Sequence, residues 1–245
     1  MSNIRLVIEY VGTRYHGWQR QPRLPTLQGV LEDCIHKIYG EKIKLIGSGR
    51  TDAGVHALGQ VANFKTSSRL NARQWENALN ALLPEDIVIL KVQAVDEAFH
   101  ARRSARSKTY QYRILNRRTP SAILASTTWH IPVPLNLHSM RAAARSLVGH
   151  HDFTSFCGKA GTAKNTHARL FGLSIQYGQN LILITLKGTH FLQYMVRNIV
   201  GTLVLVGLGN WSSKSMRSIL EARDRRYAGP TAPPHGLFLV RVNYE

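Results

Sequence analysis

Residues 47–57 of this 245-residue chain read GSGRTDAGVHA, and they combine a flexible backbone with two opposite charges. Three glycines lie within eight residues, which lets the backbone approach a ligand closely. Arg50 and Asp52 stand between those glycines. The stretch is not a phosphate-binding loop, because it lacks the Gly-Lys-Ser/Thr ending and is followed by a strand-like segment instead of a helix. From its residues alone it is either a structural turn or a catalytic loop.

Periodic apolar side chains predict the secondary structure around this stretch. Residues Ile4–Tyr10 alternate apolar and polar side chains, which is the pattern of a half-buried strand. Residues Thr26–Tyr39 have apolar side chains at helical spacing, with Thr26 as a cap and Gly40 as a stop. The same criteria predict strands at Ile43–Ile46, Gln60–Thr66 and Ile87–Val95, and a helix at Asn71–Leu83 that ends before Pro84.

The second half of the chain has a similar order of elements. Its predicted strands are Tyr110–Leu115, Leu170–Tyr177, Leu181–Lys187 and Leu237–Val242, and its predicted helices are Leu137–Val148, His190–Val206 and Ser212–Arg223. The similarity lies in the order of elements and not in residue identities. It predicts an α+β protein of two pseudo-repeated halves, residues 1–105 and 106–245, each with an antiparallel sheet and helices on its outer face.

Charge is distributed unevenly along the chain, whose formal net charge is +18. Residues 98–245 hold 20 basic and four acidic side chains, whereas residues 1–97 hold 12 basic and 10 acidic ones. Between Glu97 and Glu221 the only acidic residue is Asp152. Basic side chains that neutralise phosphates release counterions, so this depletion of acids is typical of a protein that binds a polyanion. Solubility alone would not require it.

Other features exclude several further classes. Cys34 and Cys157 cannot form a disulfide framework or a cysteine-only zinc site. The adjacent His150, His151 and Asp152 are poorly spaced to turn onto one metal ion and are better explained as a turn in which Asp152 caps a helix. No signal peptide pattern is present, and the longest apolar stretch is too short to cross a bilayer. We expect a cytoplasmic protein without a metal.

Several segments together resemble one enzyme family. Residues 49–57, GRTDAGVHA, resemble the signature of the tRNA pseudouridine synthase A family. Further segments are similar to family segments, in the family's order: Gly12–Gln19, Phe99–Arg102, Lys108–Arg113, His151–Phe156, Phe191–Leu192 and Met195–Gly201. The resemblance covers nearly the whole chain. The one difference noted is an additional arginine, Arg103.

The resemblance implies a cofactor-free isomerase. Such an enzyme breaks the glycosidic bond of a uridine, turns the uracil and rejoins it to the ribose through carbon 5. The family's invariant aspartate maps onto Asp52. Its carboxylate could add to the sugar at C1′, add to the base at carbon 6, or deprotonate the sugar at C2′, and the sequence leaves these three routes open. All three need an ionised carboxylate beside the sugar.

The resemblance also implies roles for two arginines. Arg197 is expected to pair with Asp52, because a neighbouring guanidinium opposes the rise in carboxyl pKa that burial beside a base would cause. The alternative for Arg197 is a plain helix-surface charge, although it interrupts an otherwise apolar helix, where a charge needs a partner. Arg50 is expected to enter the tRNA stem and help hold the target base out of the stack.

Aromatic and apolar side chains are implied to line the site. Tyr110 corresponds to the family tyrosine and is expected to stack on the flipped uracil. Tyr112, two positions further on the same face, is better explained as a core aromatic. Leu192 and Met195 form either the apolar wall behind the base or ordinary core. His56 either orients the aspartate stretch or is simply a buried, hydrogen-bonded histidine.

For the whole molecule, the resemblance implies a homodimer that binds the anticodon arm of tRNA and modifies positions 38, 39 and 40. The sheets of the two halves would join across a basic cleft with Asp52 at its base. Two other classes fit parts of the sequence. A non-catalytic RNA-binding module would share the charge and the aromatics, but it would have no use for a carboxylate in a glycine-rich loop. A metal-dependent nuclease would need clustered carboxylates.

Overall fold

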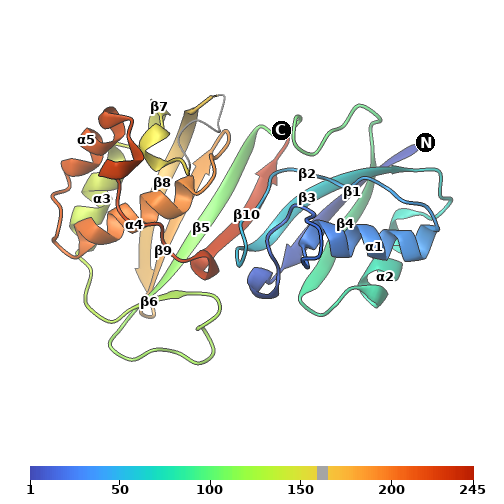
Figure 1. The fold of residues 1–245 in the computed structure, drawn as a ribbon, viewed down its shortest axis with the longest axis horizontal. Coiled ribbons are helices and arrows are strands. Elements are labelled where there is room, and N and C mark those ends of the chain that lie inside the picture. Colours follow the sequence, from blue (N-terminus) through green and yellow to red (C-terminus); the bar gives the residue numbers. More distant parts are fainter. Residues whose placement is uncertain (159–164) are drawn as a thin grey trace. The chain divides into compact units, whose positions relative to one another are not determined.

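A computed structural model describes residues 1–158 and 165–245. The chain forms two compact units: unit 1 comprises residues 1–106 and 238–245, and unit 2 comprises residues 107–237. Each unit contains both helices and strands (Figure 1). The α+β class predicted from the sequence is therefore confirmed. The last eight residues belong to unit 1, although they follow unit 2 along the chain.

Unit 1 is built on a sheet with the strand order β4-β1-β3-β10. Its strands are β1 (Ser2–Tyr10), β3 (His56–Thr66), β4 (Ile87–Val95), β10 (Leu237–Asn243) and the short β2 (Ile46–Gly47), which pairs with β3. β1 is antiparallel to both β3 and β4, whereas β10 runs parallel to β3. The sheet is therefore mixed, and the predicted antiparallel pairing holds for β1, β2, β3 and β4.

Helices α1 (Leu27–Tyr39) and α2 (Ala72–Leu82) supply the helical layer of unit 1. Phe64 of β3 lies opposite Ile4 of β1 and packs edge-on against Trp75 of α2, with 5.3 Å between the ring centroids. Residues directly opposite each other in an antiparallel pair share one face of the sheet. The alternate, fully buried side chains of β1 therefore face the same core as α2.

The capping residues of α1 lie where the sequence predicted them, and α2 has a cap that was not predicted. The Thr26 hydroxyl accepts a hydrogen bond from the Gly29 amide (3.3 Å), and Gly40 ends α1 in a left-handed conformation. Asn71 and Gln74 form a capping box at the start of α2, in which each side chain accepts from the other residue's amide. These bonds satisfy amides that would otherwise have no helical partner.

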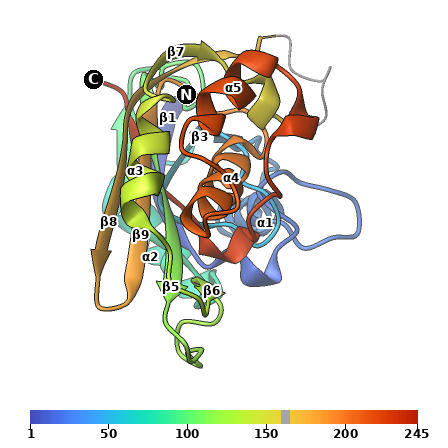
Figure 2. The same ribbon diagram turned by 90° about the vertical axis from the view of Figure 1, so that its left-hand side faces the viewer.

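The main strands of unit 2 lie in the order β5-β9-β8-β7. Its strands are β5 (Ser107–Asn116), β6 (Trp129–Ile131), β7 (Gly149–Asp152), β8 (His167–Gly178) and β9 (Leu181–Gly188). Neighbours are antiparallel except β6, which runs parallel to β5. The helices are α3 (Leu137–Arg145), α4 (Met195–Gly207) and α5 (Ser215–Ala222). Figure 2 shows α4 and α5 on the same side of β8, β9 and β5.

Helix α4 is the central element of unit 2. Its side chains are buried on nearly every side, which is the pattern of a helix enclosed by core. Residues 229–232 lie directly over it. Gly201 leaves room for Pro230, whose carbonyl oxygen would lie only 1.7 Å from an added Cβ. The Gly229 amide donates to the Thr202 hydroxyl (2.9 Å), so this loop is fixed against α4.

The predicted strand Ile43–Ile46 is wrong, since only Ile46–Gly47 pairs with β3. Side chains of α1 take the backbone hydrogen bonds that a longer strand would have used. Glu32 accepts from the Leu45 amide (3.1 Å), and the Gln28 side chain donates to the Leu45 carbonyl oxygen (3.2 Å).

Three helices are shorter than predicted: Met195–Gly207 against His190–Val206, Leu137–Arg145 against Leu137–Val148, and Ser215–Ala222 against Ser212–Arg223. The first begins late because Tyr194 adopts a left-handed conformation with φ 61°. The second ends early because the amides of residues 146–148 bond three residues back, in tighter turns. Strands β6 and β7 were not predicted, since three or four residues are too few to show a period.

The segment His150–Asp152 belongs to strand β7, so the predicted helix cap at Asp152 is wrong. Asp152 Oδ1 instead accepts hydrogen bonds from the amide and the hydroxyl of Thr154, at 3.0 and 2.6 Å. Burial would raise the pKa of Asp152, but these hydrogen bonds hold it below its usual value. The carboxylate therefore stabilises the turn that follows β7.

Candidate active site

The aspartate loop, residues 48–55, connects β2 to β3, and a buried polar network fixes its first residues. The Ser48 hydroxyl donates to Gln60 Oε1 (2.7 Å), and the Gln60 side chain donates to the Gly49 carbonyl oxygen (3.0 Å). The Ser48 amide donates to the Val61 carbonyl oxygen (2.7 Å). Ser48 and Gln60 are fully buried, so losing one of these bonds would leave a polar group unsatisfied. This end of the loop is tied to β3.

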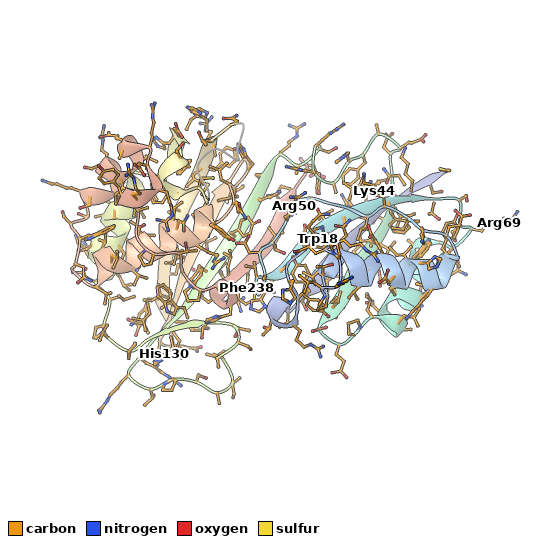
Figure 3. All side chains as sticks on the ribbon, viewed as in Figure 1. Trp18, Lys44, Arg50, Arg69, His130 and Phe238 are labelled. Atoms are coloured by element: carbon orange, nitrogen blue, oxygen red, sulfur yellow. The ribbon has the colours of Figure 1, made fainter. Side chains whose placement is uncertain are left out.

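The middle of the loop is held by residues at and after the end of β1. The Tyr10 and Thr51 hydroxyls share a buried hydrogen bond of 2.8 Å, and burial raises the pKa of Tyr10, which keeps its hydroxyl protonated. The Trp18 amide donates to the Thr51 carbonyl oxygen (3.0 Å). Trp18 lies beside the first turn of α1, where its carbonyl oxygen accepts from the Gln28 amide (2.9 Å; Figure 3). Thr51 is therefore held by both its side chain and its backbone.

His56 fixes the end of the loop. Its Nδ1 accepts a hydrogen bond from the Gly12 amide (3.0 Å), and its ring stacks on Phe238 of β10, with 4.7 Å between centroids. Gly12 allows this approach, because an added Cβ would lie 2.0 Å from the Val55 carbonyl oxygen. His56 is fully buried. The interpretation of His56 as a buried, hydrogen-bonded histidine is confirmed, and its hydrogen bond ties the start of β3 to Gly12.

Arg50 and Asp52 flank the buried Thr51 on either side. Thr51 points into the core of unit 1, whereas Arg50 is exposed and Asp52 is half-buried. Figure 3 labels Arg50 on this loop. Thr51 is thus the inward anchor between two charged residues that are more exposed than it is. The loop thus presents a carboxylate and a guanidinium on a backbone that is hydrogen-bonded along its length.

Tyr110 and Tyr112 both lie on the helix-facing side of β5. Tyr110 is 7% exposed and packs edge-on against Phe191, with ring centroids 4.9 Å apart. Tyr112 is fully buried, and its hydroxyl donates to the Pro233 carbonyl oxygen (2.7 Å). The prediction that Tyr112 is a core aromatic is confirmed. Tyr110 has an aromatic neighbour on one edge, which fixes the plane of its ring.

Arg197 lies in the first turn of α4, beside the loop that covers this helix. Its Nε donates to the Ala232 carbonyl oxygen (2.7 Å), and its own carbonyl oxygen accepts from the Ala232 amide (3.1 Å). Its guanidinium carbon lies 5.1 Å from the centre of the Tyr194 ring. Arg197 is only half-buried. These contacts give the guanidinium a defined place, which a plain surface charge would not have.

Three further residues of unit 2 bear on the candidate site: Leu192, Met195 and His235. Met195 is fully buried, so it belongs to the core, whereas Leu192 is half-buried. His235 was not identified from the sequence. Burial lowers the pKa of His235, a backbone hydrogen bond at Thr128 raises it in part, and the positive charge of Arg197 lowers it again. A histidine with a lowered pKa is neutral at physiological pH.

A buried polar network at the start of α4 was also missed by the sequence reasoning. Asn198, fully buried, donates to the Phe156 carbonyl oxygen (2.8 Å). Its Oδ1 accepts from the Thr231 hydroxyl (2.6 Å) and from Arg225 (3.2 Å). An asparagine inside an apolar helix was the one available signal, since such a group needs partners. The network fixes the residue after Arg197 and the loop above it.

The structure therefore places the predicted residues in two groups. Asp52 and Arg50 lie on the aspartate loop of unit 1, and Tyr110, Leu192 and Arg197 lie in unit 2. Within residues 1–158 and 165–245, no group of three or more His, Cys, Asp or Glu side chains could hold a metal ion. In the same described residues, no helix has the length and apolar content needed to cross a membrane.

Comparisons with known proteins agree on one family. A family model described as tRNA pseudouridine synthase matches residues 6–102 and 143–245, two segments that are consistent with a pseudo-repeated chain. A protein of Thermoanaerobacter sp. (strain X514) named tRNA pseudouridine synthase A is 45% identical over 244 residues, covering all of both chains. Proteins with the same name from Acetivibrio thermocellus and Bartonella tribocorum are 45% and 43% identical, again over the full length of both chains.

Proposed function

The chain belongs to the tRNA pseudouridine synthase family, and we propose that it isomerises uridines at positions 38, 39 and 40 in the anticodon stem-loop of tRNAs, with Asp52 as the catalytic carboxylate. The enzyme is an isomerase. The bond between uracil N1 and C1′ of the ribose breaks, a bond between carbon 5 and C1′ forms, and the proton on carbon 5 is replaced by one on N1. Every atom of the uridine is retained apart from that exchanged proton, so we propose that no cofactor takes part.

The observation that carries this proposal is that hydrogen bonds hold the backbone of the aspartate loop in a fixed position. A carboxylate that must act on one atom of the sugar needs a fixed position, because misplacement by about 1 Å can cost about a hundredfold in rate. Thr51 supplies that fixed point through its bonds to Tyr10 and Trp18. A module that only binds RNA would gain nothing from holding a carboxylate rigidly, since a carboxylate repels phosphates.

Residues of unit 2 complete the proposed site. Arg197 pairs with Asp52 and keeps its carboxyl group ionised. Tyr110 stacks on the flipped uracil, and Leu192 forms the apolar wall behind the base. Arg50 enters the stem and holds the target base out of the stack. The defined position of Arg197 against Ala232, and of Tyr110 against Phe191, supports these roles.

The proposed substrate contact extends beyond the reacting base. Taking a paired base out of a stem costs a few kcal/mol, and contacts to the phosphate backbone repay that cost. The acid-depleted residues 98–245 supply the basic side chains for those contacts. We propose that they line a basic cleft with Asp52 at its base, that the enzyme acts as a homodimer, and that it works in the cytoplasm on tRNA.

The proposal is tested by incubating the protein with an unmodified tRNA transcript and mapping pseudouridine by chemical probing. Matched transcripts carry uridine at position 38, 39 or 40 and cytidine at the other two. We expect modification at whichever of the three positions holds uridine, and none in a transcript with cytidine at all three. Binding without pseudouridine would indicate an RNA-binding module, and a cleaved transcript would indicate a nuclease; either result contradicts the proposal.

A further inference from the structure

Tyr194 has a backbone conformation that its residue type disfavours. Residues 192–195 form a turn closed by a hydrogen bond from the Met195 amide to the Leu192 carbonyl oxygen (3.1 Å). Tyr194 is the third residue of this turn, with φ 61° and ψ 0°, where glycine or asparagine is usual. A bulky residue at positive φ is strained. Such strain persists where the surrounding structure imposes it, and it concentrates at functional sites.

Neither burial nor helix capping accounts for a tyrosine at this position. Tyr194 is 37% exposed, so it is not a residue of the core. It precedes α4 but makes no side-chain capping bond to the helix. Its ring instead lies against Arg197, whose guanidinium carbon is 5.1 Å from the ring centroid. A cation at that distance from an aromatic face is attracted by it.

Arg197 is held from a second side by the loop over α4. Its Nε donates to the Ala232 carbonyl oxygen (2.7 Å). With Nε engaged and the Tyr194 ring beside the guanidinium, rotation of the planar group is restricted. The guanidinium is therefore held at its Nε edge and at its aromatic contact, and its orientation depends on both.

We infer that Tyr194 is a positioning residue for Arg197, and that its strained turn presents the aromatic ring that orients the guanidinium for the carboxylate of Asp52. This inference rests on the proposed pairing of Arg197 with Asp52. The ring provides the interaction and the hydroxyl takes no part in it. The residue at this position therefore sets the rate of the reaction and not the affinity for tRNA.

Three variants at this position separate the ring from the backbone. Tyr194→Phe keeps the ring, Tyr194→Leu removes it, and Tyr194→Asn removes it while suiting the positive φ. Tyr177→Leu is the matched control, because Tyr177 is an exposed tyrosine of the same unit on β8. The measurements are the single-turnover rate of pseudouridine formation, the Kd for tRNA and the midpoint of thermal unfolding.

We expect Tyr194→Leu and Tyr194→Asn to lower the rate by about a hundredfold, the scale of a misplaced catalytic group, with Kd unchanged. Tyr194→Phe should restore most of the rate. Tyr194→Asn should unfold at the same or a higher temperature than the wild type, because it relieves strain while it loses activity. A rate loss in the Asn variant that comes with a lower unfolding midpoint would show a structural role and overturn the inference.

A double-mutant cycle with Arg197→Met distinguishes this inference from the proposed function. If Tyr194 acts through Arg197, adding Tyr194→Leu to Arg197→Met should lower the rate no further. If Arg197→Met is slow but Tyr194→Leu has the wild-type rate, the inference alone is wrong. If Arg197→Met itself has the wild-type rate, the proposed pairing with Asp52 is wrong, and the inference about Tyr194 is wrong as well.

Discussion

The hydroxyl of Thr51 anchors the residue that precedes Asp52. It is buried with the Tyr10 hydroxyl, while the Thr51 carbonyl oxygen is held by the Trp18 amide. Removing the Thr51 hydroxyl would take one of its hydrogen-bond partners from the buried Tyr10 hydroxyl. The loop would then lose one of the two contacts that keep Thr51 inward.

We predict that Thr51→Val lowers the free energy of unfolding by about 1–3 kcal/mol, because valine has the shape of threonine but leaves the Tyr10 hydroxyl without this partner. Thr51→Ser keeps the hydroxyl and is the matched control. Urea unfolding of the two variants measures the difference. Equal unfolding midpoints for the valine and serine variants would contradict the role assigned to this hydrogen bond.

Arg50 gives a second prediction for a single residue. Its proposed task is to hold the flipped base, so Arg50→Ala should lower the single-turnover rate more than it lowers tRNA affinity. Lys44→Ala removes another exposed charge of unit 1 and serves as the control. A variant that loses only affinity would show that Arg50 is one more phosphate contact.

The sequence predicted the residues of the candidate site that carry charge or an aromatic ring, but not the residues that hold them. Arg50, Thr51 and Asp52 are adjacent, so their motif is visible in one line of sequence. Tyr10 lies 41 positions from Thr51, and a contact at that separation leaves no periodic signal. The hydrogen bond from Arg225 to Asn198 likewise joins residues that are distant in the sequence, so it could not be predicted.

At the scale of elements, local signals were reliable where the chain supplied its own caps. The sequence predicted Thr26 as the cap and Gly40 as the stop of α1, and both residues have these roles in the structure. The prediction of a strand failed where side chains from a distant part of the sequence form hydrogen bonds with the backbone. The sequence predicts a strand at Leu45, but the side chains of Glu32 and Gln28 in α1 form hydrogen bonds with its amide and its carbonyl oxygen.

We predict that Asn71→Ala lowers the unfolding free energy by about 1 kcal/mol, the usual contribution of an N-cap. For a chain of this size that corresponds to a fall of about 2–4 °C in Tm. Asn71→Asp keeps an accepting oxygen and should unfold at nearly the wild-type temperature. A Tm for Asn71→Ala equal to that of Asn71→Asp would mean that the cap does not stabilise α2.

At the scale of the whole molecule, the order of elements and the class of fold could be predicted, because strands and helices differ in period over long stretches. The return of the last strand to unit 1 could not, since β10 pairs with β3 across most of the sequence. Nothing in a strand's own residues specifies its partner. Charge is the whole-chain property that the sequence does specify, and it bears directly on RNA binding.

Binding to tRNA should weaken steeply as salt rises, with log K falling linearly in log salt. Arg106→Ala and Lys108→Ala should each reduce that slope by about one unit without changing which uridine is modified. Lys91→Ala removes an exposed charge from β4 and should leave the slope unchanged if residues 98–245 supply the contacts. A tRNA affinity that does not respond to salt would contradict this description of RNA binding.

The central claim is that Asp52 performs chemistry and does not merely support the loop. The most direct measurement is pseudouridine formation by Asp52→Asn under single-turnover conditions, together with the Kd for tRNA. Asp33→Asn, an exposed carboxylate of α1, is the matched control and should be fully active. We predict that Asp52→Asn binds tRNA at least as tightly as the wild type and forms no pseudouridine. Conversion at a rate within about tenfold of the wild type, less than 1.4 kcal/mol in the barrier, would contradict the claim.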